Sequence, residues 1–225
     1  MTVAQLTLDL PHRAALGAED FLVSDCNLAA VKLIDAWPNW QNHVQLLIGP
    51  EASGKTHLAR VWQALSGAQA LAPETLAMNL LDAMGEGTAL VVEDADKVAY
   101  DEKALFHLLN LAREKGLYVL ITAETAPSRW GVALPDLKSR LNAVPVVEIG
   151  APDEALIRTV LLKHFTDRQL DIDPKVLTYL ALHVDRSLAA AAAAVAAVDR
   201  VALASGRKIS RQLVIQALAG AKAPE

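Results

Sequence analysis

The sequence predicts an α/β fold: a parallel sheet flanked by helices, followed by a small all-helical domain. Three observations support this prediction. Short apolar runs alternate with helix-like segments between residues 45 and 150, which is typical of a parallel sheet with helices on both faces. A glycine-rich loop directly follows the first run, and no strand-like segment follows Gly150.

Four apolar runs are predicted to form the strands, because a strand buried on both faces of a sheet is continuously apolar. They are residues 44–48, 89–92, 117–122 and 145–149.

Three helices are expected between these strands. The first covers 55–65, and the second covers 75–84. In the third, Leu105, Leu108, Leu109 and Ala112 recur at the spacing of one helix face, and Gly116 ends the helix.

Beyond Gly150 the pattern becomes wholly helical. One helix is expected to open with Pro152 and two acids, and Asp173 is expected to cap another. A third covers about 187–204, and a last one runs from a Ser210 cap to Leu218. We therefore expect an extended tail over 1–12, an α/β domain over 13–150 and a helical domain over 151–225.

The composition limits the class of protein. The formal net charge is -5, and no basic patch of the kind that binds DNA directly stands out. No secretory signal is visible, and the apolar stretch 188–198 is too short to cross a membrane. We expect a cytoplasmic protein.

A phosphate-binding loop is predicted at Gly49-Pro50-Glu51-Ala52-Ser53-Gly54-Lys55-Thr56. It matches the G-x-x-x-x-G-K-[ST] pattern between a strand and a helix. Backbone N–H groups would surround the phosphates, Lys55 would reach the outer ones, and the Thr56 hydroxyl would ligate Mg²⁺. The expected cofactors are ADP or ATP with Mg²⁺, and the contacts extend to His57.

An acidic pair, Glu93-Asp94, ends the second apolar run, where both carboxylates would lie near Mg²⁺ and act in catalysis. The usual order places aspartate first and the catalytic acid second. The inverted order moves each carboxylate by about one C–C bond, and an error near 1 Å can cost about a hundredfold in rate. We expect nucleotide binding to survive and hydrolysis by the chain itself to be weak.

Three further polar sites are candidates. Thr122 or Glu124, after the third strand, can face the γ-phosphate, although polar strand ends are also common. Arg140, with Lys138 nearby, is expected on a loop from which it could reach a neighbouring subunit's nucleotide. Arg186, at the start of the long helix, could report on the bound nucleotide, although an unspecific surface role remains open for both arginines.

The segment Gln5-Leu6-Thr7-Leu8-Asp9-Leu10 carries leucines at alternate positions. Short extended peptides of this kind dock into pockets on other proteins. A disordered end or an edge strand is the simpler alternative.

Together these motifs resemble the AAA+ ATPases, most closely the DnaA branch. The stretch "EDFLVSDCNLAAVKLI" is similar to the segment that lies along the adenine, which implies base contacts by Phe21, Leu22 and Val23. By the same resemblance "ITAETAP" is the sensor 1 region with Glu124, "LPDLKSRL" carries the arginine finger as Arg140, and "VDRSL" is the sensor 2 motif with Arg186.

Two features narrow the resemblance to the Hda family. We expect the chain to lack the DNA-binding domain of DnaA, and "QLTLDL" is similar to the peptide that binds the sliding clamp. The resemblance implies an ADP-bound protein that is tethered to the DNA polymerase sliding clamp (β clamp) through Gln5, Leu6, Leu8 and Leu10. It would use Arg140 to promote hydrolysis of ATP on DnaA, with DNA reached indirectly. The alternatives are a self-assembling AAA+ loader or motor and an initiator paralogue that binds DNA directly.

Overall fold

A computed structural model describes residues 22–221 of the chain. The predicted clamp-binding residues, the rest of the expected tail and Phe21 lie outside the described residues. The chain divides into two compact units, each described below by itself. The first holds residues up to Pro50 and Gly54–Gly150, and the second holds Ala151 onward, with Glu51–Ser53 counted in it.

The first unit is built on a five-stranded sheet in which every neighbouring pair of strands is parallel. The strand order is β2-β3-β4-β1-β5, so β4 lies between β1 and β3. Parallel strands end at the same edge, and the segments that follow β1, β3 and β4 therefore meet there. The strands are β1 Val44–Ile48, β2 Gln69–Leu71, β3 Ala89–Val92, β4 Tyr118–Ala123 and β5 Val146–Glu148.

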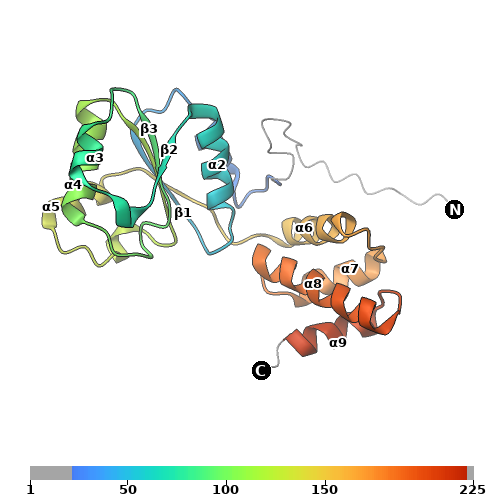
Figure 1. Ribbon diagram of the computed structural model, residues 1–225. Coiled ribbons are helices and arrows are strands. Elements are labelled where there is room, and N and C mark those ends of the chain that lie inside the picture. The colour runs from blue at the N-terminus through green and yellow to red at the C-terminus, as the bar shows by residue number, and fades with distance from the viewer. Residues whose placement is uncertain (1–21, 222–225) are drawn as a thin grey trace. The chain divides into compact units, whose positions relative to one another are not determined.

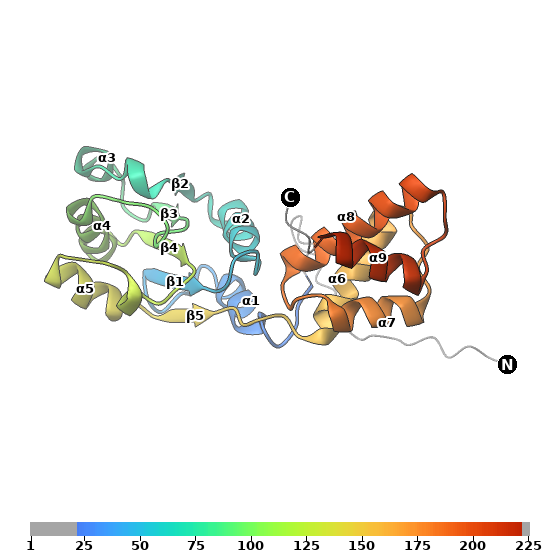
Figure 2. The ribbon, with the colours of Figure 1, turned by 90° about the horizontal axis from the view of Figure 1, so that it is seen from below.

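Helices cover both faces of this sheet (Figures 1 and 2). Alternate residues of each central strand point to opposite faces: Leu47 packs with α1 and α2, whereas Leu46 and Ile48 pack with α3, α4 and α5. Each layer meets the sheet through a cluster of buried apolar side chains, which fixes the strand register. The helices are α1 Leu28–Asp35, α2 Lys55–Ser66, α3 Met78–Asp82, α4 Glu102–Glu114 and α5 Pro135–Asn142, with short 3-10 turns η1 Pro73–Thr75 and η2 Pro127–Arg129.

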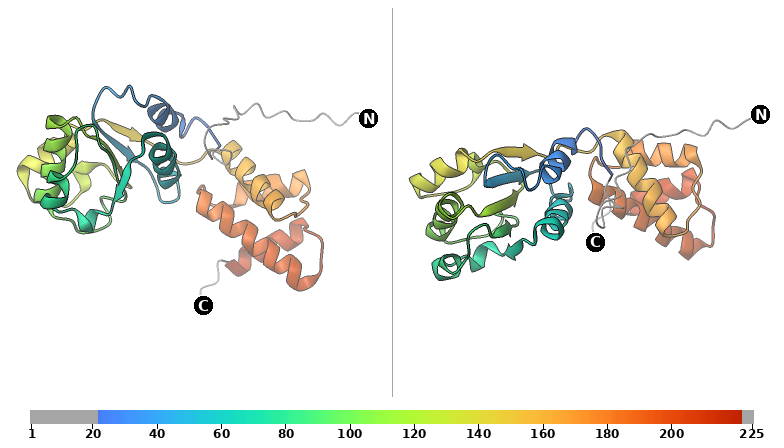
Figure 3. Two further views of the ribbon diagram at one scale, coloured as in Figure 1. Left: turned by 45° about the horizontal axis from the view of Figure 1, so that its top comes forward. Right: turned by 90° about the horizontal axis from the view of Figure 1, so that it is seen from above.

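The second unit is a bundle of four helices, visible from two further sides in Figure 3. Asp173 and Ser187 accept hydrogen bonds from the first turns of α7 and α8, and Gly206 ends α8 in the left-handed region with a φ of 60°. Phe165 and Leu161 are fully buried in its core. The helices are α6 Glu154–Asp167, α7 Pro174–His183, α8 Leu188–Ser205 and α9 Arg211–Ala221.

Within the described range, α8 is the one helix that is long and apolar enough to cross a membrane by length and composition. Its buried face, which includes Ala191, Val195 and Val198, belongs to the core of the helical bundle.

Several predicted elements need correction. The helix expected over 75–84 is broken into η1 and the five-residue α3, because Ala77 adopts an extended conformation between them. The segment that carries Arg140 is a helix, α5, and not a loop: Pro135 fits its first turn, and Leu137 and Leu141 bury one face. Pro152 lies before α6, which Asp153 caps.

Three elements were not predicted: α1, β2 and the short turn η2. The edge strand β2 has only three residues, of which two are exposed, so it lacks the apolar run that marks the other strands.

Candidate nucleotide-binding site

The loop between β1 and α2 has the geometry of an anion-binding nest. Ala52 and Gly54 take left-handed φ values of 56° and 102°, which turns successive N–H groups to one side. The backbone N–H groups of 51–56 donate to no other residue among those described. Six donors in a row at the start of a twelve-residue helix favour a negatively charged ligand.

Two buried side chains reinforce the polarity of this loop. The hydroxyl oxygen of Ser53 is buried and has no hydrogen-bond partner in the described structure, which is a costly state for a polar atom unless a ligand satisfies it. Lys55 is 5% exposed, and its Nζ donates to the carbonyl oxygens of Gly49 at 2.7 Å and Pro50 at 2.8 Å.

The electrostatic surroundings of Lys55 identify its neighbours. Burial lowers the pKa of Lys55, and the carboxylate of Asp94 opposes this effect most strongly, followed by that of Glu124. The loop lysine therefore faces the acidic turn after β3 and the end of β4, as their places in the sheet require.

The acidic turn is held against β4 by Thr122. Asp94 has a left-handed φ of 54°, and its N–H donates to the Thr122 hydroxyl at 3.0 Å, while the N–H of Ala95 donates to the Thr122 carbonyl at 2.9 Å. Thr122 is 1% exposed. In the structure this threonine thus fixes the turn that carries Asp94.

Asp96, which no sequence motif marks, holds the next segment by hydrogen bonds. Its carboxylate accepts hydrogen bonds from the N–H groups of Glu124 at 2.9 Å and Thr125 at 2.8 Å, and from the Thr125 hydroxyl at 2.8 Å. Desolvation acts to raise the pKa of Asp96, but these hydrogen bonds outweigh it and lower the pKa below its ordinary value. The partners lie 28 and 29 positions away in the sequence, so no local pattern marks this residue.

A second cation, Lys97, joins the two carboxylates nearest Lys55. Its Nζ lies 2.9 Å from a carboxylate oxygen of Glu124 and 3.7 Å from one of Asp94. Asp94 and Glu124 are therefore brought together, while the Glu93 side chain, half-buried at the end of β3, makes no ion pair with another described residue.

The predicted metal ligands do not form a preformed cation site. No group of three or more histidine, cysteine or carboxylate side chains in residues 22–221 is arranged so that it could hold a metal ion by itself. Thr56 is exposed at the start of α2, and its hydroxyl, with Glu93 and Asp94, provides only oxygen donors of the kind Mg²⁺ takes. Such a site is completed by the phosphates of the nucleotide.

The segment expected to lie along the base is partly described. Leu22 and Val23 are half-buried, and Val23 packs against the cluster that contains Leu58 and Ala59 of α2. The Leu22 carbonyl accepts a hydrogen bond from the Asn27 side chain at 2.9 Å. This segment therefore lies beside the helix that begins at the phosphate loop. His57 is half-buried on the same helix.

The two predicted arginines come from segments other than this loop. Arg140 is exposed on α5 and lines a pocket with His43 and Val44, at the start of β1. The phosphate loop follows the other end of that strand, about 13 Å away at about 3.3 Å per residue. Arg186 belongs to the second unit and precedes the Ser187 cap of α8, so it stands just outside the long helix that it was predicted to begin.

Comparison with known proteins establishes the fold. No family model matches the sequence. Domain III of the replication initiation protein DnaA from Thermotoga maritima is similar with a TM-score of 0.71 at 19% identity, over 92% of this chain and 96% of that one.

Two other types of structure are also similar. The replication initiator DnaA bound to AMPPCP and single-stranded DNA has a TM-score of 0.65 at 16% identity, over 80% of this chain and only 63% of that one. The Thermotoga maritima RuvB Holliday junction branch migration motor has a TM-score of 0.65 at 16% identity, over 87% of this chain and 66% of that one. The predicted fold class is confirmed: the chain has the AAA+ fold shared by DnaA domain III and RuvB, with a parallel sheet flanked by helices and a helical C-terminal part.

Proposed function

We propose that this chain is an ADP-dependent negative regulator of DNA replication initiation of the Hda type. In this proposal residues 5–10 tether it to the DNA polymerase sliding clamp. It then promotes hydrolysis of DnaA-bound ATP through Arg140, which acts as an arginine finger in trans. The similarity to DnaA domain III supports the replication setting.

Nucleotide binding rests on the phosphate loop. The row of unpaired N–H groups, the buried Ser53 hydroxyl and Lys55 suit the phosphates of ADP or ATP. Lys55 would exchange its bonds to Gly49 and Pro50 for bonds to phosphate oxygens. Mg²⁺, held by Thr56 and the acidic turn, would neutralise phosphate charge, and Arg186 would couple the helical unit to the nucleotide.

Weak hydrolysis by the chain itself follows from the acidic turn. The longer Glu93 stands where the usual aspartate would be, and the shorter Asp94 takes the place of the catalytic acid. The Lys97 ammonium lies 3.7 Å from the Asp94 carboxylate, so a cation neighbours the group that would have to activate water.

The position of Arg140 is the observation that carries the proposal. It is exposed at the edge of the sheet opposite the chain's own phosphate loop, and the Phe106 ring lies 5.2 Å from its Cζ. An arginine so placed has no access to the chain's own nucleotide but is available to that of a partner. An arginine finger of this kind raises the rate of nucleotide hydrolysis by about 10³–10⁵-fold.

Tethering explains how an acidic protein could act near DNA. With a net charge of -5, the chain is unsuited to direct DNA binding. A clamp loaded on DNA would bring it close to its partner by raising the effective concentration.

The test is hydrolysis of DnaA-bound ATP, measured with purified clamp on DNA, with and without this protein and ADP. We expect stimulation that is lost in Arg140→Ala and retained in Lys138→Ala, an exposed neighbour on the same helix that does not line the pocket. Leu6→Ala with Leu8→Ala should abolish clamp binding but leave ADP binding intact. Absence of stimulation by the wild type contradicts the proposal, and if Arg140→Ala lowers only the protein's own ATPase activity, a motor is indicated instead.

A further inference from the structure

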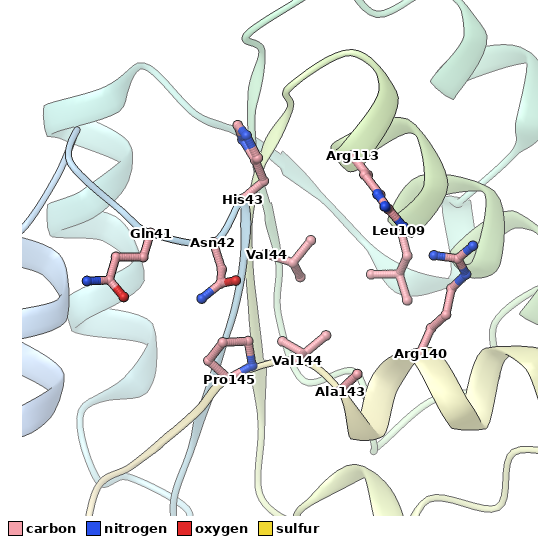
Figure 4. A pocket seen from close by; sticks show the side chains of 10 residues that line it. All are labelled: Gln41, Asn42, His43, Val44, Leu109, Arg113, Arg140, Ala143, Val144 and Pro145. Carbon is pink, nitrogen blue, oxygen red and sulfur yellow. The ribbon is translucent and has the colours of Figure 1, made fainter.

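The pocket beside Arg140 carries a second arginine with no assigned role. It has a volume of about 330 Å³ and lies between the segment before β1 and the helices α4 and α5. Figure 4 shows the side chains of Arg113 and Arg140 on the side of the pocket formed by the two helices, across from Asn42 and His43. The lining residues are Gln41, Asn42, His43, Val44, Leu109, Arg113, Arg140, Ala143, Val144 and Pro145.

The charge of this pocket is uncompensated within the described part of the chain. No acidic residue lines it, and neither guanidinium forms an ion pair with a carboxylate of residues 22–221. Like charges that share a pocket repel each other, and an anion bound between them removes this cost. The excess of positive charge is unusual for a chain whose net charge is -5.

Contacts within the chain position Arg140 on one side of the pocket and the segment 42–43 on the other. On α4, Phe106, Leu109 and Arg113 are spaced by three and four residues, so they share one helix face, and the Phe106 ring holds the Arg140 guanidinium. On the other side, the His43 carbonyl accepts a hydrogen bond from the Val119 N–H at 2.8 Å, and the Asn42 carbonyl accepts one from the Gln45 side chain at 3.2 Å. The imidazole of His43 packs on Tyr118.

The donor set favours a phosphate over a single carboxylate. Two guanidinium groups bring two permanent charges, and each can form bidentate bonds with phosphate oxygens. Gln41 and Asn42 add amide donors, while the apolar side chains of Val44, Leu109 and Val144 make the surroundings of these groups less polar than water. A ligand with charge of about -2 or more satisfies such a site.

We propose that this pocket binds the terminal phosphates of a nucleotide held by a partner AAA+ protein, and that Arg113 is a second phosphate-contacting residue beside Arg140. This inference rests on the proposed function for the identity of the partner, but the anion site itself does not. Arg113 would form charged hydrogen bonds to the phosphates, and each such bond contributes to the free energy of the contact. Loss of Arg113 should therefore lower stimulation of the partner's ATP hydrolysis by roughly 10- to 150-fold.

The first arm of the test needs no partner. Tripolyphosphate is titrated into the full-length protein saturated with ADP, and the arginine Nε–H and histidine ring signals are followed by NMR. We expect the signals of Arg113, Arg140 and His43 to shift together in the wild type, and the binding to weaken at least tenfold in Arg113→Ala. Lys103→Ala, which removes the same charge from α4 about 15 Å along the helix axis, should bind like the wild type.

The second arm measures hydrolysis of DnaA-bound ATP and binding to DnaA loaded with ATP or ADP. Arg113→Ala should lose both the stimulation and the preference for the ATP form, Arg113→Lys should regain part of each, and Lys103→Ala should keep both. Normal stimulation by a folded Arg113→Ala, or the absence of tripolyphosphate binding to the wild type, overturns the inference. If the wild type stimulates nothing yet binds tripolyphosphate through Arg113, the proposed function fails and the anion site stands.

Discussion

Replacing Asp96 by alanine removes the acceptor that joins the acidic turn after β3 to the end of β4. Its carboxylate accepts hydrogen bonds from two backbone N–H groups and the Thr125 hydroxyl, all at 3.0 Å or less. The same segment carries Glu124, and the Thr125 carbonyl accepts a hydrogen bond from the Trp130 indole at 2.9 Å. The substitution therefore loosens the part of the site that faces the phosphate loop.

The expected loss of stability is moderate because the site is only half-buried. A hydrogen bond to a charged group contributes about 1.5–3 kcal/mol, and here water can replace part of the lost acceptor. We expect Asp96→Ala to lower the free energy of unfolding by about 2–4 kcal/mol at pH 7. Asp171→Ala, at an exposed position in the second unit, should change it by less than about 0.5 kcal/mol.

The effect depends on pH with a defined sign. Because hydrogen bonding lowers the pKa of folded Asp96 below its ordinary value, the contribution of Asp96 to stability is complete above the pKa of about 3.9 in the unfolded chain. The contribution is lost as the pH falls through the folded pKa. The difference in free energy of unfolding between wild type and Asp96→Ala should therefore be large at pH 7 and smaller near pH 3.

Tryptophan fluorescence during urea unfolding measures this difference in the free energy of unfolding. Trp37, Trp40, Trp62 and Trp130 are the four tryptophans of the chain, and all lie in the first unit, so the signal follows the unit that contains Asp96. Equal midpoints for wild type and Asp96→Ala at pH 7, or a gap that stays constant between pH 7 and pH 3, would refute the reasoning.

Three other substitutions test separate parts of the structure. Thr122→Val leaves the Asp94 N–H without its acceptor and should lower the free energy of unfolding by about 1–3 kcal/mol in the same fluorescence measurement. Thr122→Ser keeps the hydroxyl and should lower it less. Equal losses would contradict the assigned hydrogen bond. Phe165→Ala creates a cavity in the helical unit, where Phe165 is 0% exposed, and should cost about 3–5 kcal/mol in unfolding followed by circular dichroism. A loss below about 1 kcal/mol would count against the packed core. Lys55→Met removes a buried charge, so the melting temperature of the nucleotide-free protein should stay the same or rise. ADP should no longer raise that melting temperature. Continued stabilisation by ADP would argue against a phosphate contact at Lys55.

The central strands were predictable because burial on both sides leaves a continuous apolar signature. Residues 44–48 and 89–92 were predicted as strands, and β1 and β3 have those bounds. The helix after the phosphate loop and the caps at Asp173 and Ser210 depend on local hydrogen bonds within a few residues, so local sequence contains the necessary information.

Elsewhere the determining contacts are distant in the chain. The role of Asp96 depends on residues 28 and 29 positions away, and the pocket beside Arg140 joins residues 41–44 to α4 and α5. Arg113 carries no motif, and only the packing of α5 on α4 brings it beside Arg140. Arg140 is a candidate from its place before the last strand and from the resemblance, whereas its helix is not predicted, because eight residues from Pro135 to Asn142 are too few to show a clear helical period.

Calorimetric titration of ADP and of ATP with Mg²⁺ into the purified protein tests the central claim most directly, namely that the loop ending in Lys55 and Thr56 binds nucleotide phosphates. We predict saturable binding of one nucleotide per chain, absent in Lys55→Met. A wild-type protein that unfolds cooperatively by tryptophan fluorescence but binds neither nucleotide would contradict the account.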